Sequence, residues 1–154
     1  LIINDHVELC LTVDADGVHV GGTDASVAQA RSVLGPGKIV GASCYGELAL
    51  ARNAQRDGAS YVAFGGFYPS RVKQYSFRTD PSVINQAKAE IALPLVVIGG
   101  MTPENAAPLV TRGADMVAAI SSIYMAAVPG AAVGEFDALF AERAKSCATH
   151  GAAV

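Results

Sequence analysis

Short apolar runs alternate with segments of helical periodicity along most of this sequence. Most of the apolar runs are continuous rather than alternating with polar residues, which is typical of strands buried on both faces of a parallel sheet. The predicted strands are Leu1–Ile3, Gly17–Val20, Lys38–Ala42, Tyr61–Gly65, Leu95–Gly99 and Met116–Ile120. Between them, apolar residues recur three or four positions apart, as at Val27, Ala30 and Leu34, and predict helices packed on that sheet.

Alternating strands and helices predict an α/β fold with a parallel sheet, either an open doubly wound sheet or a barrel. An open sheet usually carries one glycine-rich turn after its first strand. Here polar residues follow nearly every predicted strand, at Asn4–Asp5, Gly21–Asp24, Ser43, Ser70–Lys73, Gly99–Gly100 and Ser121–Ser122. We therefore favour a TIM-type (β/α)8 barrel, with residues 1–154 forming one partial domain of six β/α units. Because the chain opens inside a predicted strand, we expect the first two units to be missing from this sequence.

Composition narrows the classes of partner. The 154 residues carry a net charge of -3, and their 11 Lys and Arg residues are scattered, which argues against a nucleic-acid partner. No apolar run approaches the roughly 18 residues that a membrane span requires. Three cysteines without metal-type spacing favour a reducing cytoplasm. An incomplete barrel would expose strand edges near Leu1 and Met116, so a homo-oligomer is one possibility.

Two segments indicate a phosphate site. Gly99 and Gly100 end a strand just before a helix predicted to begin near Thr102, so the backbone there can approach a ligand closely. Ser121 and Ser122 end the last predicted strand, ahead of a final helix expected from about residue 134. Loops after the last two strands form the common phosphate site of barrels. The alternative is that the glycines only make a tight turn.

Asp5 and Asp24 each follow a strand, so in a barrel they would face one mouth from adjacent strands. Two carboxylates repel each other unless a cation lies between them, and Mg²⁺ favours such oxygen ligands together with substrate phosphate. Either aspartate alone is more often a helix cap or a turn residue. The pair therefore predicts a magnesium site, with an ordinary structural role as the alternative.

Other polar residues carry weaker signals. Lys73 ends the loop that starts at Phe67, and its charge could cover a phosphate, although a solvated basic loop is the simpler interpretation. His19 lies inside a predicted strand, and we interpret it as a packed barrel residue rather than a catalyst. Cys44 is a weak candidate nucleophile because no histidine partner is evident.

In order and spacing, these segments resemble thiamine-phosphate synthases. The matching stretches lie between residue 1 and about residue 125, at Leu1–Asp5, Gly17–Gly21, Asp24, Ile39–Cys44, Gly65–Lys73, Ile98–Asn105 and Ile120–Ile123. Singly some of them are generic barrel sequence, but together they are fairly specific. The resemblance implies a transferase that joins hydroxymethylpyrimidine diphosphate to thiazole phosphate, giving thiamine phosphate and pyrophosphate. It also implies Mg²⁺ as the cofactor and these small molecules as the partners.

The resemblance implies roles for individual residues as well. Asp5 and Asp24 would bind Mg²⁺ on the diphosphate. Substrate contacts would come from Asn4, Ser43 and Lys73 on the pyrimidine side and from Ser70, Gly100 and Ser121 on the thiazole-phosphate side. Ile120 would be a further substrate-binding residue. Ser43 and Lys73 are the residues assigned to catalysis. The family is thought to pass through a pyrimidine-stabilised carbocation, so the lack of a strong nucleophile in this sequence is expected.

The sequence departs from the family pattern in two places. Val72 stands where the loop usually carries a second hydroxyl, and no Gln-x-Arg-x-Lys segment, which grips the diphosphate, is present. If the missing units are absent from the molecule, we expect little or no synthase activity. The alternatives are a thiazole tautomerase-like enzyme, which would use a histidine and no metal, and a degenerate, non-catalytic phosphate-binding barrel. Asp5, Asp24 and Lys73 count against the tautomerase.

Overall fold

The protein folds as a curved sheet of six parallel strands. The computed structural model describes residues 1–22, 24–70 and 76–151, with side chains as far as residue 145. The strands are β1 (Ile2–Asn4), β2 (Gly17–Val20), β3 (Ile39–Tyr45), β4 (Tyr61–Phe64), β5 (Leu95–Ile98) and β6 (Met116–Ala118). Each strand pairs in parallel with the next one along the chain, so the sheet order is β1-β2-β3-β4-β5-β6. In a doubly wound sheet, the strand order would change direction partway across the sheet. The sequential order seen here therefore confirms the barrel-type prediction.

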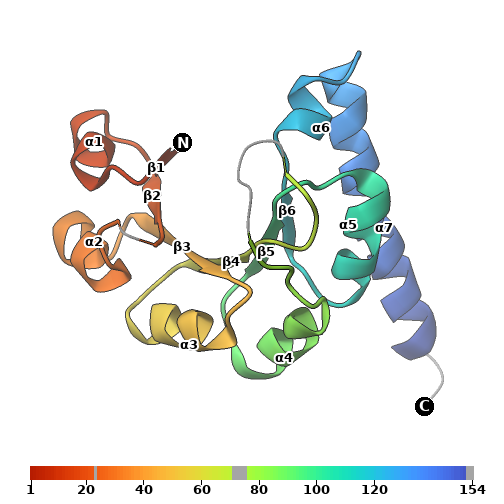
Figure 1. Ribbon diagram of the computed structural model, residues 1–154, viewed down its shortest axis with the longest axis horizontal. Coiled ribbons are helices and arrows are strands. Elements are labelled where there is room, and N and C mark those ends of the chain that lie inside the picture. Colours follow the sequence, from red (N-terminus) through yellow and green to blue (C-terminus); the bar gives the residue numbers. More distant parts are fainter. Residues whose placement is uncertain (23, 71–75, 152–154) are drawn as a thin grey trace.

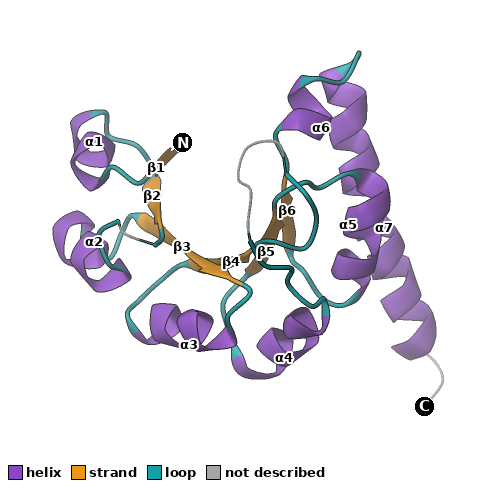
Figure 2. Ribbon diagram, viewed as in Figure 1, coloured by secondary structure: helices purple, strands orange, loops and turns teal. Residues whose placement is uncertain are grey.

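Helices cover the outer, convex side of the curved sheet (Figures 1 and 2). The helices are α1 (Val7–Thr12), α2 (Val27–Leu34), α3 (Leu48–Arg56), α4 (Ser82–Glu90), α5 (Pro103–Thr111), α6 (Ser121–Tyr124) and α7 (Pro129–Gly151). The long helix α7 packs outside α5. None of the helices in the described ranges is long and apolar enough to span a membrane.

The core lies between the strands and the helices. The strand residues Val18, Val40, Val62 and Leu95 are fully buried, as the continuous apolar runs predict. The predicted stripe of α2 is buried in full, at Val27, Ala30 and Leu34. Burying such side chains contributes about 1.5–3 kcal/mol each relative to leaving them exposed, so this layer stabilises the packing of the helices on the sheet.

Two predicted boundaries are wrong by three residues or more, while the others differ by at most two. Strand β3 continues to Tyr45 instead of ending at Ala42, because its pairing with β4 runs on through a shift in register between Ser43 and Tyr45. Helix α7 begins at Pro129 instead of about residue 134. Proline is favoured at the first helical position because it has no N–H to leave unpaired there, and Pro129 accounts for this earlier start.

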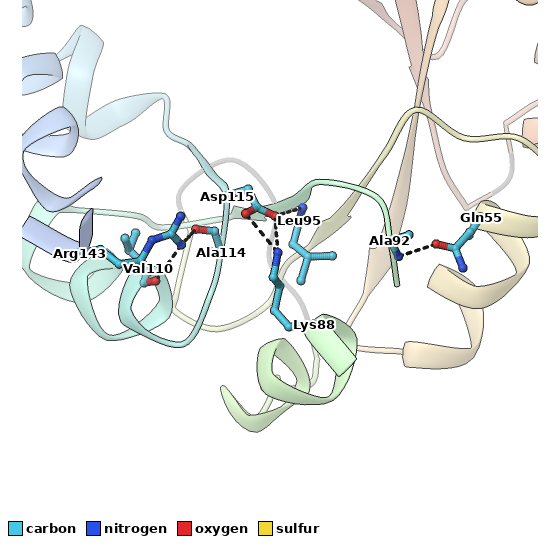
Figure 3. Close-up of polar contacts among 8 residues, drawn as sticks. All are labelled: Gln55, Lys88, Ala92, Leu95, Val110, Ala114, Asp115 and Arg143. Carbon is cyan, nitrogen blue, oxygen red and sulfur yellow. Dashed lines mark hydrogen bonds and ion pairs between the residues drawn. The ribbon is translucent and has the colours of Figure 1, made fainter. Parts of the chain in front are cut away.

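Side chains tie down the turns that lead from helices back into strands (Figure 3). Lys88 in α4 pairs with Asp115, whose carboxylate also accepts the backbone N–H of Leu95 at 2.9 Å. Arg143 of α7 donates to the carbonyls of Val110 and Ala114, at 3.2 and 2.6 Å. These contacts lie where the strands begin. In barrels, residues at this end stabilise the fold, whereas catalytic residues lie at the opposite end.

Candidate active site

The carboxyl ends of the strands share one edge of the sheet, and five of the six strands end in unusual backbone. Positive φ angles occur there at Asp5 (66°), Gly22 (59°), Tyr45 (53°), Gly66 (82°), Gly99 (94°) and Gly100 (66°). Tyr45 has a bulky side chain that disfavours this conformation, whereas aspartate, as at Asp5, tolerates it better than most residues. Residues held in sparsely populated backbone regions cluster at functional sites. This edge is therefore the place to look for chemistry.

The two predicted metal ligands lie on neighbouring strands at this edge. Asp5 directly follows β1, and its N–H donates to the carbonyl of His19 in β2 at 2.9 Å. The amide of Asn4 donates to the Asp5 carboxylate at 2.7 Å. After β2, the carboxylate of Asp24 accepts the N–H of Gly21 at 3.0 Å. Backbone and amide donors thus orient both carboxylates.

The donor chemistry of this pair fits Mg²⁺. Among the described residues, no group of three or more His, Cys, Asp and Glu side chains could enclose a metal ion. Mg²⁺ does not require such an enclosure, because it commonly binds one or two carboxylates plus substrate phosphate and water. Asp5 and Asp24, both half-buried at adjacent strand ends, supply ligands of that kind.

A hydrogen-bonded trio crosses the concave face of β2, β3 and β4. His19 places Nδ1 2.9 Å from the hydroxyl of Tyr61 and Nε2 2.8 Å from Oγ of Ser43. The rings of His19 and Tyr61 are stacked, with centroids 5.5 Å apart. Burial raises the pKa of the Tyr61 phenol, which therefore stays protonated near neutral pH. His19 is a strand residue, as predicted, but it also fixes the predicted catalytic residue Ser43.

Sequence reasoning missed this trio, although one signal was available. Gly41 pairs with His19 in the sheet, and a Cβ at that position would lie 2.1 Å from Cζ of Tyr61 and 2.6 Å from Nδ1 of His19. Glycine is thus required for the two rings to meet. A glycine inside a strand often marks such a close approach.

The predicted phosphate segments come together at the other end of the edge. A Cβ on Gly100 would lie 2.2 Å from the carbonyl oxygen of Pro69, which places Gly100 against the loop that carries Ser70. Asn105 donates to the Gly100 carbonyl at 2.9 Å and forms a capping box with Thr102. The structure therefore confirms the predicted start of α5 and fixes the conformation of the glycine turn.

The start of α6 joins the same cluster. Ser122 donates its hydroxyl to the carbonyl of Met101 at 2.6 Å, so it ties α6 to the loop after β5. Ser121 is half-buried beside it, and Ile120, which precedes the helix, is exposed. Gly100 and Ser121 therefore belong to adjacent, connected loops, as the predicted phosphate site requires.

A pocket of about 370 Å³ opens beside the loop after β4. It is lined by Gly66, Phe67, Tyr68, Pro69, Ser70, Phe77 and Arg78. Thr79 closes the loop by donating its hydroxyl to the Gly65 carbonyl at 2.6 Å. Arg78 is a cationic lining residue that sequence reasoning did not single out. The predicted catalytic residue Lys73 and its neighbour Val72 lie outside the described residues.

Cys44 has no role as a nucleophile in this site. Its thiol is buried within β3, and burial raises its pKa to about 12. Only the thiolate is strongly nucleophilic, so the thiol is inert at neutral pH. This environment agrees with the sequence-based prediction that Cys44 is only a weak candidate nucleophile.

The fold and the site define a class: a singly wound parallel β/α protein of the barrel type, with polar ligands at the carboxyl ends of its strands. Comparison with known proteins narrows the class. Residues 1–123 match the family model described as thiamine monophosphate synthase. The thiamine-phosphate synthases of Janthinobacterium sp. (strain Marseille) and Thiobacillus denitrificans are 61% and 51% identical to the chain, each over 141 residues. The chain belongs to the thiamine-phosphate synthase family.

These matches cover 92% of this chain and about two thirds of each relative, 68% and 67%. Among solved structures, the thiamine phosphate pyrophosphorylase from Pyrococcus furiosus superposes with a TM-score of 0.80 at 30% identity, covering 92% of this chain and 67% of that chain. A 3-hexulose-6-phosphate synthase, at 24% identity and a TM-score of 0.65, shares the fold alone. The fold and the family that the sequence predicted are both confirmed.

Proposed function

We propose that this chain carries the substrate-joining site of a thiamine-phosphate synthase, a transferase that combines hydroxymethylpyrimidine diphosphate with thiazole phosphate and releases pyrophosphate. One observation carries the proposal beyond family membership. The same sheet edge holds a carboxylate pair after β1 and β2 and a glycine–serine cluster after β5 and β6. A reaction between two phosphorylated substrates requires two such parts. The carboxylate pair would bind the cation of one substrate, and the glycine–serine cluster would bind the phosphate of the other.

Asp5 and Asp24 would hold the metal ion and, through it, the diphosphate. When bound, Mg²⁺ would neutralise the charge of the diphosphate, so that the bond to the pyrimidine breaks more easily. Ser43 would contact the pyrimidine or its pyrophosphate, with its hydroxyl held by His19 at 2.8 Å. Asn4 would contact the same substrate from the end of β1. Lys73, assigned by the family likeness, would add a positive charge for the leaving pyrophosphate.

The thiazole phosphate would lie at the opposite end of the edge. Gly100 allows close approach of backbone because it has no Cβ, and Ser121 begins the helix next to it. Ser70 would add a hydroxyl from the pocket wall. Ile120, which is exposed just before α6, would be a further substrate contact. Together they would place this substrate across the mouth from the diphosphate.

We also propose a cytoplasmic location, because the three cysteines show no spacing typical of disulfides or metal sites. We propose small-molecule partners, because the net charge of -3 does not favour nucleic acid.

The test is formation of thiamine phosphate by the purified protein, with Asp5→Asn and Asp24→Asn as variants. Each removes a carboxylate that would carry the metal, so we expect product formation to fall at least about 100-fold, as for loss of a transition-state charge contact. Asp137→Asn, in exposed α7, is the matched control and should leave the rate unchanged.

Two outcomes would overturn the proposal. Binding of thiazole phosphate without any product would identify a phosphate-binding protein without turnover. Isomerisation of a thiazole phosphate that survives chelation of divalent cations would indicate a tautomerase. Both outcomes are seen by following the substrates and the product in one chromatographic assay.

A further inference from the structure

Tyr45, at the end of β3, has a conformation that nothing in its local sequence requires. Its φ is 53°, a region in which a bulky side chain is a true outlier. The register of β3 against β4 shifts between Ser43 and Tyr45, and the Tyr45 carbonyl is held by the N–H of Gly65 at 2.8 Å. Strain of this kind persists only where the surrounding structure enforces it.

This conformation directs the Tyr45 side chain away from β4 and across to the loop after β2. A Cβ on Gly22 would lie 2.7 Å from the Tyr45 hydroxyl oxygen, and a Cβ on Gly21 would lie 3.5 Å from the same atom. The phenol therefore rests directly on two consecutive glycines. A side chain at Gly22 would displace it.

The same glycines orient the predicted metal ligand. Gly21 donates its N–H to the Asp24 carboxylate, and its carbonyl accepts the N–H of Asp24, both at 3.0 Å. A shift of Gly21 would move both bonds together. Tyr45 therefore contacts the glycine that is hydrogen-bonded to the Asp24 carboxylate.

We propose that Tyr45 is a positioning residue: its phenol fixes the Gly21–Gly22 backbone and thereby holds the Asp24 carboxylate in the orientation that binds a divalent cation. This inference rests on the proposed function, because it takes Asp24 as a ligand of the cation. Partners that orient a ligand typically change metal affinity when they are removed, even though they do not touch the metal.

The experiment is a titration of the purified protein with Mn²⁺, followed by the electron paramagnetic resonance signal of free Mn²⁺. Tyr45→Ala removes the phenol, and we expect the affinity for Mn²⁺ to fall about tenfold, as for loss of a partner outside the first coordination shell. Tyr45→Phe keeps the ring and should lose less. Tyr124→Ala, which removes a tyrosine that is 78% exposed in α6, is the matched control.

A double-mutant cycle separates positioning from general loosening of the fold. Gly22→Ala places a methyl group against the Tyr45 hydroxyl, so we expect it to weaken Mn²⁺ binding more in the parent protein than in Tyr45→Ala. Additive effects would overturn the inference. So would a Tyr45→Ala variant that unfolds at lower urea concentration but binds Mn²⁺ with parental affinity.

Asp24→Asn distinguishes failure of this inference from failure of the proposed site. If Asp24→Asn abolishes Mn²⁺ binding while Tyr45→Ala leaves it unchanged, Asp24 is a ligand and Tyr45 is not its positioning residue. If Asp24→Asn itself binds Mn²⁺ normally, the metal site is wrong and the inference falls with it.

Discussion

The two edges of the same sheet are built in opposite ways. Where the strands begin, charged side chains bond to the backbone of the turns, as Asp115 and Arg143 do (Figure 3). Where the strands end, the backbone takes positive φ values, and polar side chains bond to one another, as His19 does to Ser43 and Tyr61. Positive φ occurs at both edges, but at the amino edge it falls on Gly35, Gly58, Gly113 and the small polar residue Asp14, whereas at the carboxyl edge it includes the bulky Tyr45.

This difference separates stability from function within one sheet. In barrels, chemistry is located at the carboxyl ends of the strands and stability at their amino ends. If the same division holds here, a change at the amino edge should alter the free energy of unfolding but not the activity per folded molecule. A change at the carboxyl edge should do the reverse.

Arg31→Ala should produce the largest loss of stability. Arg31 of α2 donates to the carbonyls of Gly35, Lys38 and Gly58 and to the hydroxyl of Ser60. Hydrogen bonds to a charged group are worth more than neutral ones, and partly buried acceptors would lose their donor, so we expect a loss of about 3 kcal/mol. Urea unfolding measures it.

Arg56→Ala is the matched control, because the Arg56 side chain is 70% exposed and forms a surface ion pair with Asp57. It should change the free energy of unfolding by less than about 0.5 kcal/mol. If Arg31→Ala instead lowered the rate of thiamine phosphate formation per folded molecule, the proposed separation of the two edges would fail.

Asp115→Ala should have an intermediate effect. Its carboxylate accepts the partly buried N–H of Leu95 at the start of β5, and removing it leaves that donor unpaired, at a cost of about 1–2 kcal/mol. Lys88→Ala removes only the ion pair, which is partly exposed, and should cost about 0.5 kcal/mol. Equal losses in the two variants, measured by urea unfolding, would show that the ion pair and not the backbone contact matters.

The order of strands and helices could be predicted because burial fixes it. Strand Gly17–Val20 is predicted with both ends correct, since its apolar run ends where its burial ends. Strand β3 is predicted too short because Ser43 and Tyr45 are polar, and parallel pairing carries the strand on past its apolar residues. The hydrophobic pattern of a strand alone does not show how far its pairing with a neighbouring strand extends.

The site was predictable only in part for the same reason. That Asp5, Asp24 and Gly100 share one edge could be predicted, because each of them follows a strand. The contacts of His19 with Ser43 and Tyr61 depend on the relative register of three strands, which hydrophobic pattern leaves open. The φ of Tyr45 depends on its neighbours in space, because no local signal favours positive φ for an aromatic residue.

The sharpest comparison of the two edges uses two aspartates that share one backbone conformation. Asp5 has a φ of 66° at the carboxyl edge, and Asp14 has a φ of 48° at the amino edge, where its carboxylate pairs with Lys38 at 2.6 Å. Glycine adopts positive φ without steric cost, so each change to glycine removes strain while it removes a carboxylate. Any property that a variant loses can then be assigned to the carboxylate that was removed.

Asp5→Gly should raise the free energy of unfolding slightly, by about 0.5 kcal/mol, because the released strain slightly exceeds the added freedom of the unfolded chain. At the same time it should abolish Mn²⁺ binding. Asp14→Gly should leave Mn²⁺ binding intact and change stability by no more than about 0.5 kcal/mol, since its ion pair is largely exposed. Urea unfolding and Mn²⁺ titration on the same preparations check both. A loss of more than about 1 kcal/mol in Asp5→Gly would mean that the carboxyl edge also stabilises the fold, because strain relief alone cannot lower stability.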